Sequence, residues 1–458
     1  MAQMSQAGDL TSGPMLKKII LFSLPLAASS FLQLLFNAAD VVVVGRFAGS
    51  AALAAVGSNG ALINLLVNLF VGLALGANVV AARCYGAKDD QGVHEAVQTA
   101  VTLSLVGGVL MAFVGFFAAH GLLELMSSPE DVIDLATLYL KIYFIGMPMT
   151  MLYNFNASLL RAVGDTRRPL VCLAVAGVIN VVLNLLFVIV FQMSVAGVAL
   201  ATILSQTVSA IMVTVLLVRE EGAMHLDLRH LGFHKKAMLQ IIQIGLPAGL
   251  QSTVFSLSNV VIQSAINSFG SVVMAGSSAA SGIENFIHTA LNTFYQSAIT
   301  FTGQSIGASD PRRAVRVFRI NLALTTGLGI VLCALAQIFQ APLLGLYVQS
   351  TDPAYDAVIA AGVVRVLALS RFQWVGGLME TACGTLRGLG HSMNPTVTTL
   401  MGACLLRVVW RYTVFEAVGT VESMYWSYPV SWLLTFLIHL IYLERDRRRL
   451  MVENTAAR

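Results

Sequence analysis

Three acidic residues, Asp40, Glu284 and Glu380, lie inside long apolar stretches of this chain. Because an ionisable side chain is costly inside a membrane-spanning helix, each is a candidate functional residue. Asp40 occurs in FNAADVVVVGRF, six residues before Arg46, which places it about 9 Å from the end of its helix. A carboxylate at that depth can exchange a proton or coordinate a hard monovalent cation.

Polar side chains at helical spacing are expected near Asp40. The stretch VINVVLN places Asn180 and Asn184 on one helix face, about 18–24 Å from the helix start, which matches the depth of Asp40. We predict a proton- or cation-coupling site, in which these three residues would hold Na⁺ if sodium is the ion. Interhelical hydrogen bonding that serves packing alone is the alternative. The predicted site consists of Asp40, Asn180, Asn184, Thr202, Tyr143 and Asn156.

The other two acids suggest a substrate cleft. Glu284 lies ten residues into its helix, about 15 Å deep and near the middle of the membrane. For Glu380, a buried structural ion pair with an arginine near it in the sequence is the alternative. Those arginines are Arg371, Arg407 and Arg411. The predicted cleft, which would attract a cationic substrate, consists of Glu284, Glu380, Gln206 and Asn154.

The composition predicts the kind of element that positions these residues. Of the 458 residues, 57% are apolar and 11% are charged, and the mean hydropathy is +0.79. Soluble domains carry roughly 25% charged residues, and apolar runs of about 20 residues cross a membrane as helices. We therefore expect an all-α polytopic membrane protein. The net charge of +4 is concentrated in short loops and the C-terminal tail, which favours a topological signal over a nucleic-acid partner.

Charged or Gly/Pro-rich breaks separate twelve expected transmembrane helices. Alternate loops and the termini carry 21 of the 27 Lys and Arg residues, so both termini are expected on the cytoplasmic side of the cell inner membrane. The predicted spans are 15–46, 53–81, 93–118, 132–163, 168–191, 194–218, 236–266, 274–303, 314–341, 356–388, 394–416 and 424–444.

An internal repeat relates the two halves of the chain. LRAVGDTRRP (160–169) and LRGLGHSMNP (386–395) share one pattern, and SLPLAASS resembles GLPAGLQS, which aligns Pro25 with Pro247. Six helices separate the copies, so both have the same orientation, an arrangement typical of carriers with a site between two lobes. The predicted parts are a cytoplasmic tail (1–14), an N-lobe (15–218), a linker (219–235), a C-lobe (236–444) and a basic tail (445–458).

Each copy of the signature is expected to end one helix and begin the next. Gly164 and Gly390 can adopt the positive φ that ends a helix. Pro169 and Pro395 suit the first turn of the following helix. Arg161 and Arg387 can reach lipid phosphates or the last helix carbonyls. The signature therefore indicates a structural role.

Motifs for enzyme chemistry are missing from the sequence. There is no GxxxxGK[ST] nucleotide loop and no complete nucleophile elbow, so we expect a protein that is not an enzyme and needs no cofactor. The GxxxG pair Gly72 and Gly76 favours a helix-packing surface.

The chain resembles the multidrug and toxic compound extrusion (MATE) family, within the wider multidrug/oligosaccharidyl-lipid/polysaccharide exporter group. The paired signatures, NAADVVVVGRF and the two sets of six helices carry the resemblance. It implies two pseudo-symmetric six-helix bundles in a V shape, and export of organic cations in exchange for H⁺ or Na⁺. The family's coupling aspartate matches Asp40, and its polar pair matches Asn180 and Asn184.

The resulting hypothesis is a secondary active multidrug efflux antiporter that exports xenobiotics as a monomer surrounded by membrane lipids. Binding of the coupling ion at Asp40 would bend the first helix, with Pro25 as the kink. A flippase or exporter of a lipid-linked or other metabolite is the first alternative. An ion channel is the second, although the internal repeat argues for a carrier.

Overall fold

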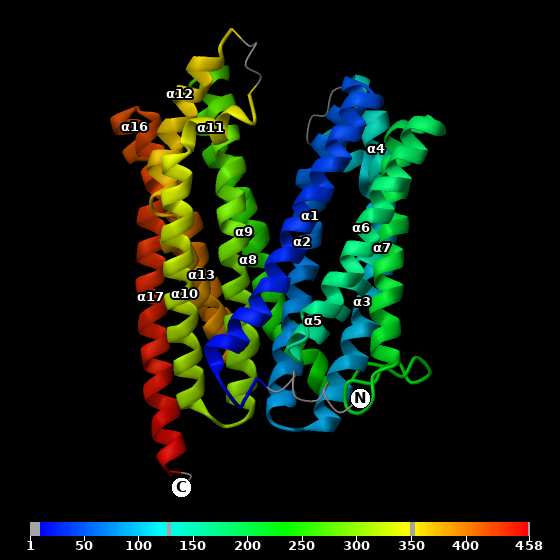
Figure 1. Ribbon diagram of the computed structural model, residues 1–458, viewed down its shortest axis with the longest axis vertical. Coiled ribbons are helices and arrows are strands. Elements are labelled where there is room, and N and C mark those ends of the chain that lie inside the picture. Colours follow the sequence, from blue (N-terminus) through cyan, green and yellow to red (C-terminus); the bar gives the residue numbers. More distant parts are fainter. Residues whose placement is uncertain (1–9, 126–129, 349–352, 457–458) are drawn as a thin grey trace. The chain divides into compact units, whose positions relative to one another are not determined.

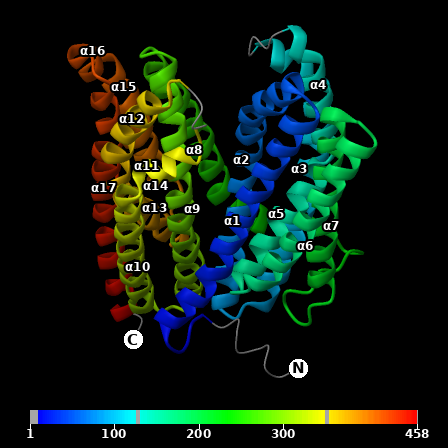
Figure 2. The ribbon, with the colours of Figure 1, turned by 45° about the horizontal axis from the view of Figure 1, so that its top comes forward.

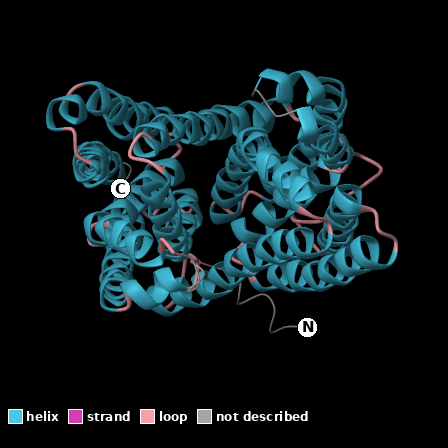
Figure 3. Ribbon diagram, turned by 90° about the horizontal axis from the view of Figure 1, so that it is seen from above, coloured by secondary structure: helices cyan, strands magenta, loops and turns pink. Residues whose placement is uncertain are grey.

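The computed structural model describes residues 10–125, 130–348 and 353–456, and every secondary-structure element in these ranges is a helix (Figure 3). The predicted all-helical class is confirmed. Chain contacts divide the helices into two units, which are described separately (Figure 1). The first unit consists of Met1–Leu10 and Leu24–Gly249, and the second of Thr11–Ser23 and Leu250–Arg458.

The first unit contains α1 from Leu24 onward, the helices through α7, and the beginning of α8. α6 continues directly into one π-helical turn, η1. The bounds are α1 Met15–Phe47, α2 Ser50–Gly86, α3 Asp90–Leu125, α4 Glu130–Ile145, α5 Met147–Ala162, α6 Arg167–Leu185, η1 Leu186–Val190 and α7 Ser194–Val218.

The second unit contains the part of α1 before Leu24, the rest of α8 and the helices through α17 (Figure 2). Two predicted spans are interrupted by π-helical turns, η2 and η3. The bounds are α8 Lys235–Asn267, α9 Ser271–Gly307, α10 Pro311–Ile338, α11 Gln340–Gly345, α12 Tyr355–Arg365, η2 Val366–Ser370, α13 Gln373–Gly388, α14 Met393–Thr399, η3 Leu400–Leu405, α15 Leu406–Tyr412, α16 Val414–Val418 and α17 Val421–Ala456.

Twelve spans are consistent with this order of elements. Among the described residues, seven helices are long and apolar enough to cross a membrane, or up to nine if each bent pair is one span. The bent pairs are Val132–Ile145 with Met147–Ala162, at 50°, and Tyr355–Ser370 with Gln373–Gly388, at 42°. The chain is therefore a multi-pass membrane protein.

The boundary between the units lies inside α8, after Gly249, and not in the predicted linker 219–235. The linker folds back onto the first unit, where the Leu226 amide donates to the Leu217 carbonyl at 3.1 Å. The His234 amide donates to the Thr99 hydroxyl of α3, also at 3.1 Å. The side chain of Leu226 is completely buried, so the apolar content of this segment explains why it packs on the helices.

The signature loops have the predicted backbone. Gly164 and Gly390 have φ values of 89° and 86°, the left-handed conformation that ends a helix. Pro169 and Pro395 both lie in the first turn of the next helix, α6 and α14 respectively. Both copies therefore form a helix stop followed by a helix start, as predicted.

The GxxxG pair of α2 forms a close helix crossing, which confirms its predicted packing role. Gly72 faces the backbone of Gly249, and Gly76 faces that of Ile241 and Gly245. A Cβ atom at Gly76 would lie 2.9 Å from the Gly245 nitrogen, closer than real Cβ contacts allow. Glycine at these positions lets the backbones of α2 and the first part of α8 approach.

Candidate functional site

A close contact between α1 and α6 positions the predicted coupling residues. The ring of Phe36 packs on Gly177 so closely that no Cβ atom could fit at that glycine. Both helices continue in the same direction from this contact. Asp40 lies one turn beyond Phe36, and Asn180 and Asn184 lie one and two turns beyond Gly177, at about 1.5 Å per residue. The contact therefore brings the three polar side chains to the same depth.

Asn184 is the central residue of this cluster. Its Nδ2 atom donates hydrogen bonds to Asp40 Oδ1 and to Asn180 Oδ1, the latter at 3.2 Å. Asn184 is fully buried, and its Oδ1 atom has no hydrogen-bond partner among the described residues. The carboxylate and the two amide oxygens are the donor type that hard cations prefer, and the unpaired oxygen fits such a ligand. The carboxylate can also take up a proton.

Two tyrosines of α4 stack on each other, and one of them, Tyr139, lies near the cluster. The rings of Tyr139 and Tyr143 are 6.3 Å apart and nearly parallel. Tyr139 is buried in the apolar core with Val43 and Val44 of α1, and it lies within electrostatic range of Asp40. The sequence analysis selected Tyr143 and missed Tyr139, although the spacing of four residues on one helix was a usable signal.

The remaining predicted coupling residues bond elsewhere. Asn156 donates from Nδ2 to the Thr214 hydroxyl of α7 at 2.8 Å. It lies six residues before the end of α5, about 9 Å from that end, whereas Asn180 is about 20 Å from the start of α6. Thr202 donates to the Val198 carbonyl of its own helix at 2.9 Å. The structure therefore brings together only the Asp40, Asn180 and Asn184 part of the set.

The two N-lobe residues predicted for the substrate cleft differ in their bonding. Asn154 donates to the Thr150 carbonyl one turn earlier on α5, at 2.9 Å. The Oε1 atom of Gln206 is buried and has no hydrogen-bond partner among the described residues. Gln206 therefore retains an acceptor for a ligand.

Glu284 is not the free carboxylate that the sequence predicted. Arg365 of α12 donates to both of its carboxylate oxygens, from Nε at 3.0 Å and from Nη2 at 2.9 Å. The same guanidinium donates from Nη1 to the Ser277 hydroxyl at 2.6 Å. Both charged side chains are nearly buried, so the negative charge of Glu284 is neutralised inside the second unit.

Glu380 forms an ion pair, but with none of the three arginines suggested by the sequence. Its Oε1 atom lies 2.9 Å from His288 Nε2, and its Oε2 atom accepts from Asn292 Nδ2 at 3.4 Å. His288 and Asn292 are one turn apart on α9. The side chain of His288 is 53% exposed, compared with 25% for Glu380, so this pair is far more accessible than Glu284 with Arg365.

The arginine of the second signature faces inward and not toward lipid. Arg387 is 4% exposed, donates from Nη2 to Gln251 Oε1 at 2.8 Å, and donates from Nη1 to the Tyr295 hydroxyl. Its carbon Cζ also lies 5.8 Å from the centre of the Tyr295 ring. The prediction that Arg387 reaches lipid phosphates is therefore wrong, because α8 and α9 supply its partners inside the unit.

Comparison with known proteins identifies the family of this chain. A family model described as MatE matches residues 25–186 and 247–413, almost three quarters of the chain. The chain belongs to the MatE family. The two matched segments begin at Pro25 and Pro247, the pair that the internal repeat aligns. The MatE unit is therefore present twice, as the repeat predicted.

Relatives of this MatE-family chain include two proteins of Bacillus subtilis (strain 168). "Probable multidrug resistance protein YoeA" is 27% identical over 92% of this chain and 92% of its own length. "Probable multidrug resistance protein YpnP" is 28% identical over 88% of this chain and 89% of its own. The solved structure of a MOP superfamily transporter from Pyrococcus furiosus is 20% identical, covers 97% of this chain and 99% of its own, and has a TM-score of 0.90.

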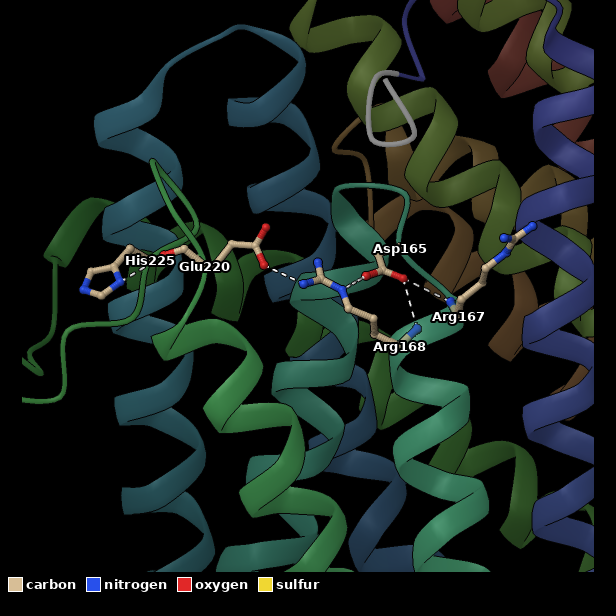
Figure 4. A network of polar contacts seen from close by, with 5 residues as sticks. All are labelled: Asp165, Arg167, Arg168, Glu220 and His225. Carbon is tan, nitrogen blue, oxygen red and sulfur yellow. Dashed lines mark hydrogen bonds and ion pairs between the residues drawn. The ribbon is translucent and has the colours of Figure 1, made fainter. Parts of the chain in front are cut away.

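In this MatE-family chain, the first signature also anchors the end of α7 (Figure 4). Asp165 accepts hydrogen bonds from the backbone amides of Arg167 and Arg168, each at 3.1 Å, and from the Arg168 side chain. Arg168 Nη1 donates to Glu220 Oε2 at 2.6 Å, and the Glu220 carbonyl lies 3.2 Å from His225 Nδ1. The charged residues of GDTRR therefore tie the α5–α6 loop to the segment after α7, a structural role.

Proposed function

We propose that this chain is a secondary active exporter of organic drugs, and that the Asp40, Asn180 and Asn184 cluster couples export to the inward movement of H⁺ or Na⁺. The multidrug-resistance names of its relatives support the export activity. The single observation that carries the coupling proposal is the hydrogen bond from buried Asn184 to Asp40. That bond joins two helices through an ionisable group inside the apolar region, where structural bonding alone would not need a charge.

The coupling step follows from the change of charge at Asp40. An ionised carboxylate accepts a strong, charge-assisted hydrogen bond from Asn184. A proton that neutralises Asp40 weakens this bond and releases α1 from α6. Pro25 lies inside α1 and removes one of its backbone hydrogen bonds, so α1 bends there at lower cost. Substrate release outward would accompany this movement, and no resident cofactor is needed.

The substrate proposal relies on Glu380 and not on Glu284. Glu284 is neutralised by Arg365, whereas Glu380 is paired with the exposed and titratable His288. A neutral His288 leaves a net negative charge at Glu380, which would attract an organic cation. A metabolite exporter is the second candidate. The prediction of a cationic substrate depended on Glu284 and Glu380, and the charge of Glu284 is already neutralised by Arg365. Transport of a cationic and an anionic dye, measured side by side, separates the two.

Asp40→Asn is the direct test of coupling. In proteoliposomes with a proton or a sodium gradient imposed separately, we expect one gradient to drive substrate movement by the wild-type protein. Asp40→Asn should reduce that movement to the level of empty liposomes, while Asp356→Asn, which changes an exposed acid on α12, should transport normally. Full gradient-driven transport by Asp40→Asn would show that the cluster does not couple the ion.

The proposed orientation places both termini in the cytoplasm of the cell membrane, and the proposed functional unit is a monomer. The excess of Lys and Arg on one set of loops supports the orientation. A reporter that is active only outside the cytoplasm should stay inactive when fused after Arg458. An active fusion would reverse the proposed topology without affecting the coupling test.

A further inference from the structure

A groove lies between α10 and α17 of the second unit, where these helices run side by side and contact α13 (Figures 1 and 2). Its apolar walls include Phe318 of α10 and Leu440 and Leu443 of α17, and the end of α13 contributes Thr385 and Leu389. The lining residues of α10 and of α17 recur every three or four positions, so one face of each helix forms a wall.

The groove crosses the boundary between headgroups and hydrocarbon. After Arg319, α10 contains no charged residue up to its end at Ile338. α17 contains no Asp, Glu, Lys or Arg between Glu422 and Glu444. Charged residues that flank such runs mark the edge of the hydrocarbon layer. Because Arg319 and Glu444 both line the groove, one end of it lies among headgroups and the other among acyl chains.

The charged end of the groove has a surplus of positive charge. Arg319 is exposed and makes no hydrogen bond or ion pair with any residue that the structure describes. Arg447, also in the lining, donates from Nη2 to Glu444 Oε1 at 2.7 Å. Glu444 is the single acid in the lining, so Arg319 remains uncompensated. A guanidinium binds a phosphate through two parallel hydrogen bonds.

We propose that this groove binds one anionic glycerophospholipid. Arg319, assisted by Arg447, holds the phosphate, and an acyl chain lies along Phe318, Leu440 and Leu443. Three properties of the groove together match a phospholipid: its level in the membrane, its apolar inner wall and its positively charged end. A free phosphate would use only the charged end, and a neutral apolar molecule only the wall.

Native mass spectrometry of the full-length protein, titrated with phosphatidylglycerol, tests the proposal. Arg319→Gln should weaken binding of the tightest phosphatidylglycerol about fivefold, the change expected for one arginine near an anionic lipid. Arg445→Gln is the matched control, because it removes an equal and exposed charge of α17 outside the groove lining. Leu443→Trp, which fills the apolar wall, should also weaken binding.

The remaining outcomes are equally decisive. Glycerol phosphate in excess should not displace the lipid, and phosphatidylcholine should bind more weakly than phosphatidylglycerol. Equal losses in Arg319→Gln and Arg445→Gln would mean that lipids respond only to overall charge, which overturns the proposal. Displacement by glycerol phosphate, or normal binding by Leu443→Trp, would show that no acyl chain occupies the groove.

Discussion

Arg365 of α12 forms a two-pronged ion pair with Glu284 of α9, with both nitrogen–oxygen distances at or below 3.0 Å. The guanidinium also lies 5.6 Å from the centre of the Tyr425 ring, and residue Arg365 is 5% exposed. Two opposite charges are thus enclosed together within the second unit. This relationship explains why an acid inside the membrane region need not be a ligand for substrate or ions.

Breaking this pair should be costly for stability. Glu284→Gln leaves the charge of Arg365 buried without a counter-ion, so we expect the free energy of unfolding to fall by about 3–5 kcal/mol. The double variant Glu284→Leu with Arg365→Met should lose less than either single change. Unfolding of the purified variants in detergent measures the free energy of unfolding of the single and of the double variant. The control is Glu416→Gln, which breaks the exposed pair with Arg411 and should cost less than about 1 kcal/mol.

Gly72→Ala should disturb the crossing of α2 with α8. The added methyl group would overlap the backbone of Gly249, so we expect a loss of roughly 1–3 kcal/mol in unfolding free energy. Gly327→Ala is the matched control, since open space surrounds that position in α10 and alanine favours helices. If both variants unfolded at the wild-type temperature, the close crossing would not contribute to stability.

The two signature copies should respond differently to the loss of corresponding side chains. Asp165→Ala removes the acceptor for two amides at the start of α6, and we expect a cost of about 1–2 kcal/mol. His391 occupies the same position in the second copy, and its Nε2 atom lies 3.9 Å from Asp446 Oδ2. His391→Ala should therefore change stability by less than about 0.5 kcal/mol. Thermal unfolding at low and high salt measures the stability of both variants. Equal losses of unfolding free energy would contradict the different roles of the two signature copies.

The exposed segment after α7 should show a pH-dependent contact. Asp227 accepts from His230 at 2.6 Å and from the Arg229 amide at 2.9 Å, and these hydrogen bonds hold the pKa of Asp227 below its ordinary value. Since the bonds favour the carboxylate, their stabilisation is complete above the ordinary aspartate pKa and is lost as the pH falls through the lowered pKa. His230→Ala should move the pKa of Asp227 back upward. An NMR titration of the Asp227 carboxyl carbon measures this shift, and an unchanged pKa would rule out His230 as its cause.

Sequence alone determined the helical class, the repeat and the depth of Asp40. Apolar runs specify helices in a membrane because backbone groups must be paired within the element. A fixed rise per residue then makes depth calculable, so Asp40 and the Asn180–Asn184 pair could be placed at the same level before any contact was known. Glycine and proline predicted the signature turns because the backbone conformations that they favour depend on the residue itself and not on distant contacts.

Only the tertiary structure decided which charges meet. Glu284 pairs with Arg365, 81 positions away, and Glu380 with His288, 92 positions away, whereas sequence proximity had suggested other arginines for Glu380. Helix depth limits the possible partners, but helix rotation and packing select among them. The inward direction of Arg387 and the docking of Leu226 on the first unit have the same origin. Depth is a local property of a helix, while pairing depends on how several helices pack together.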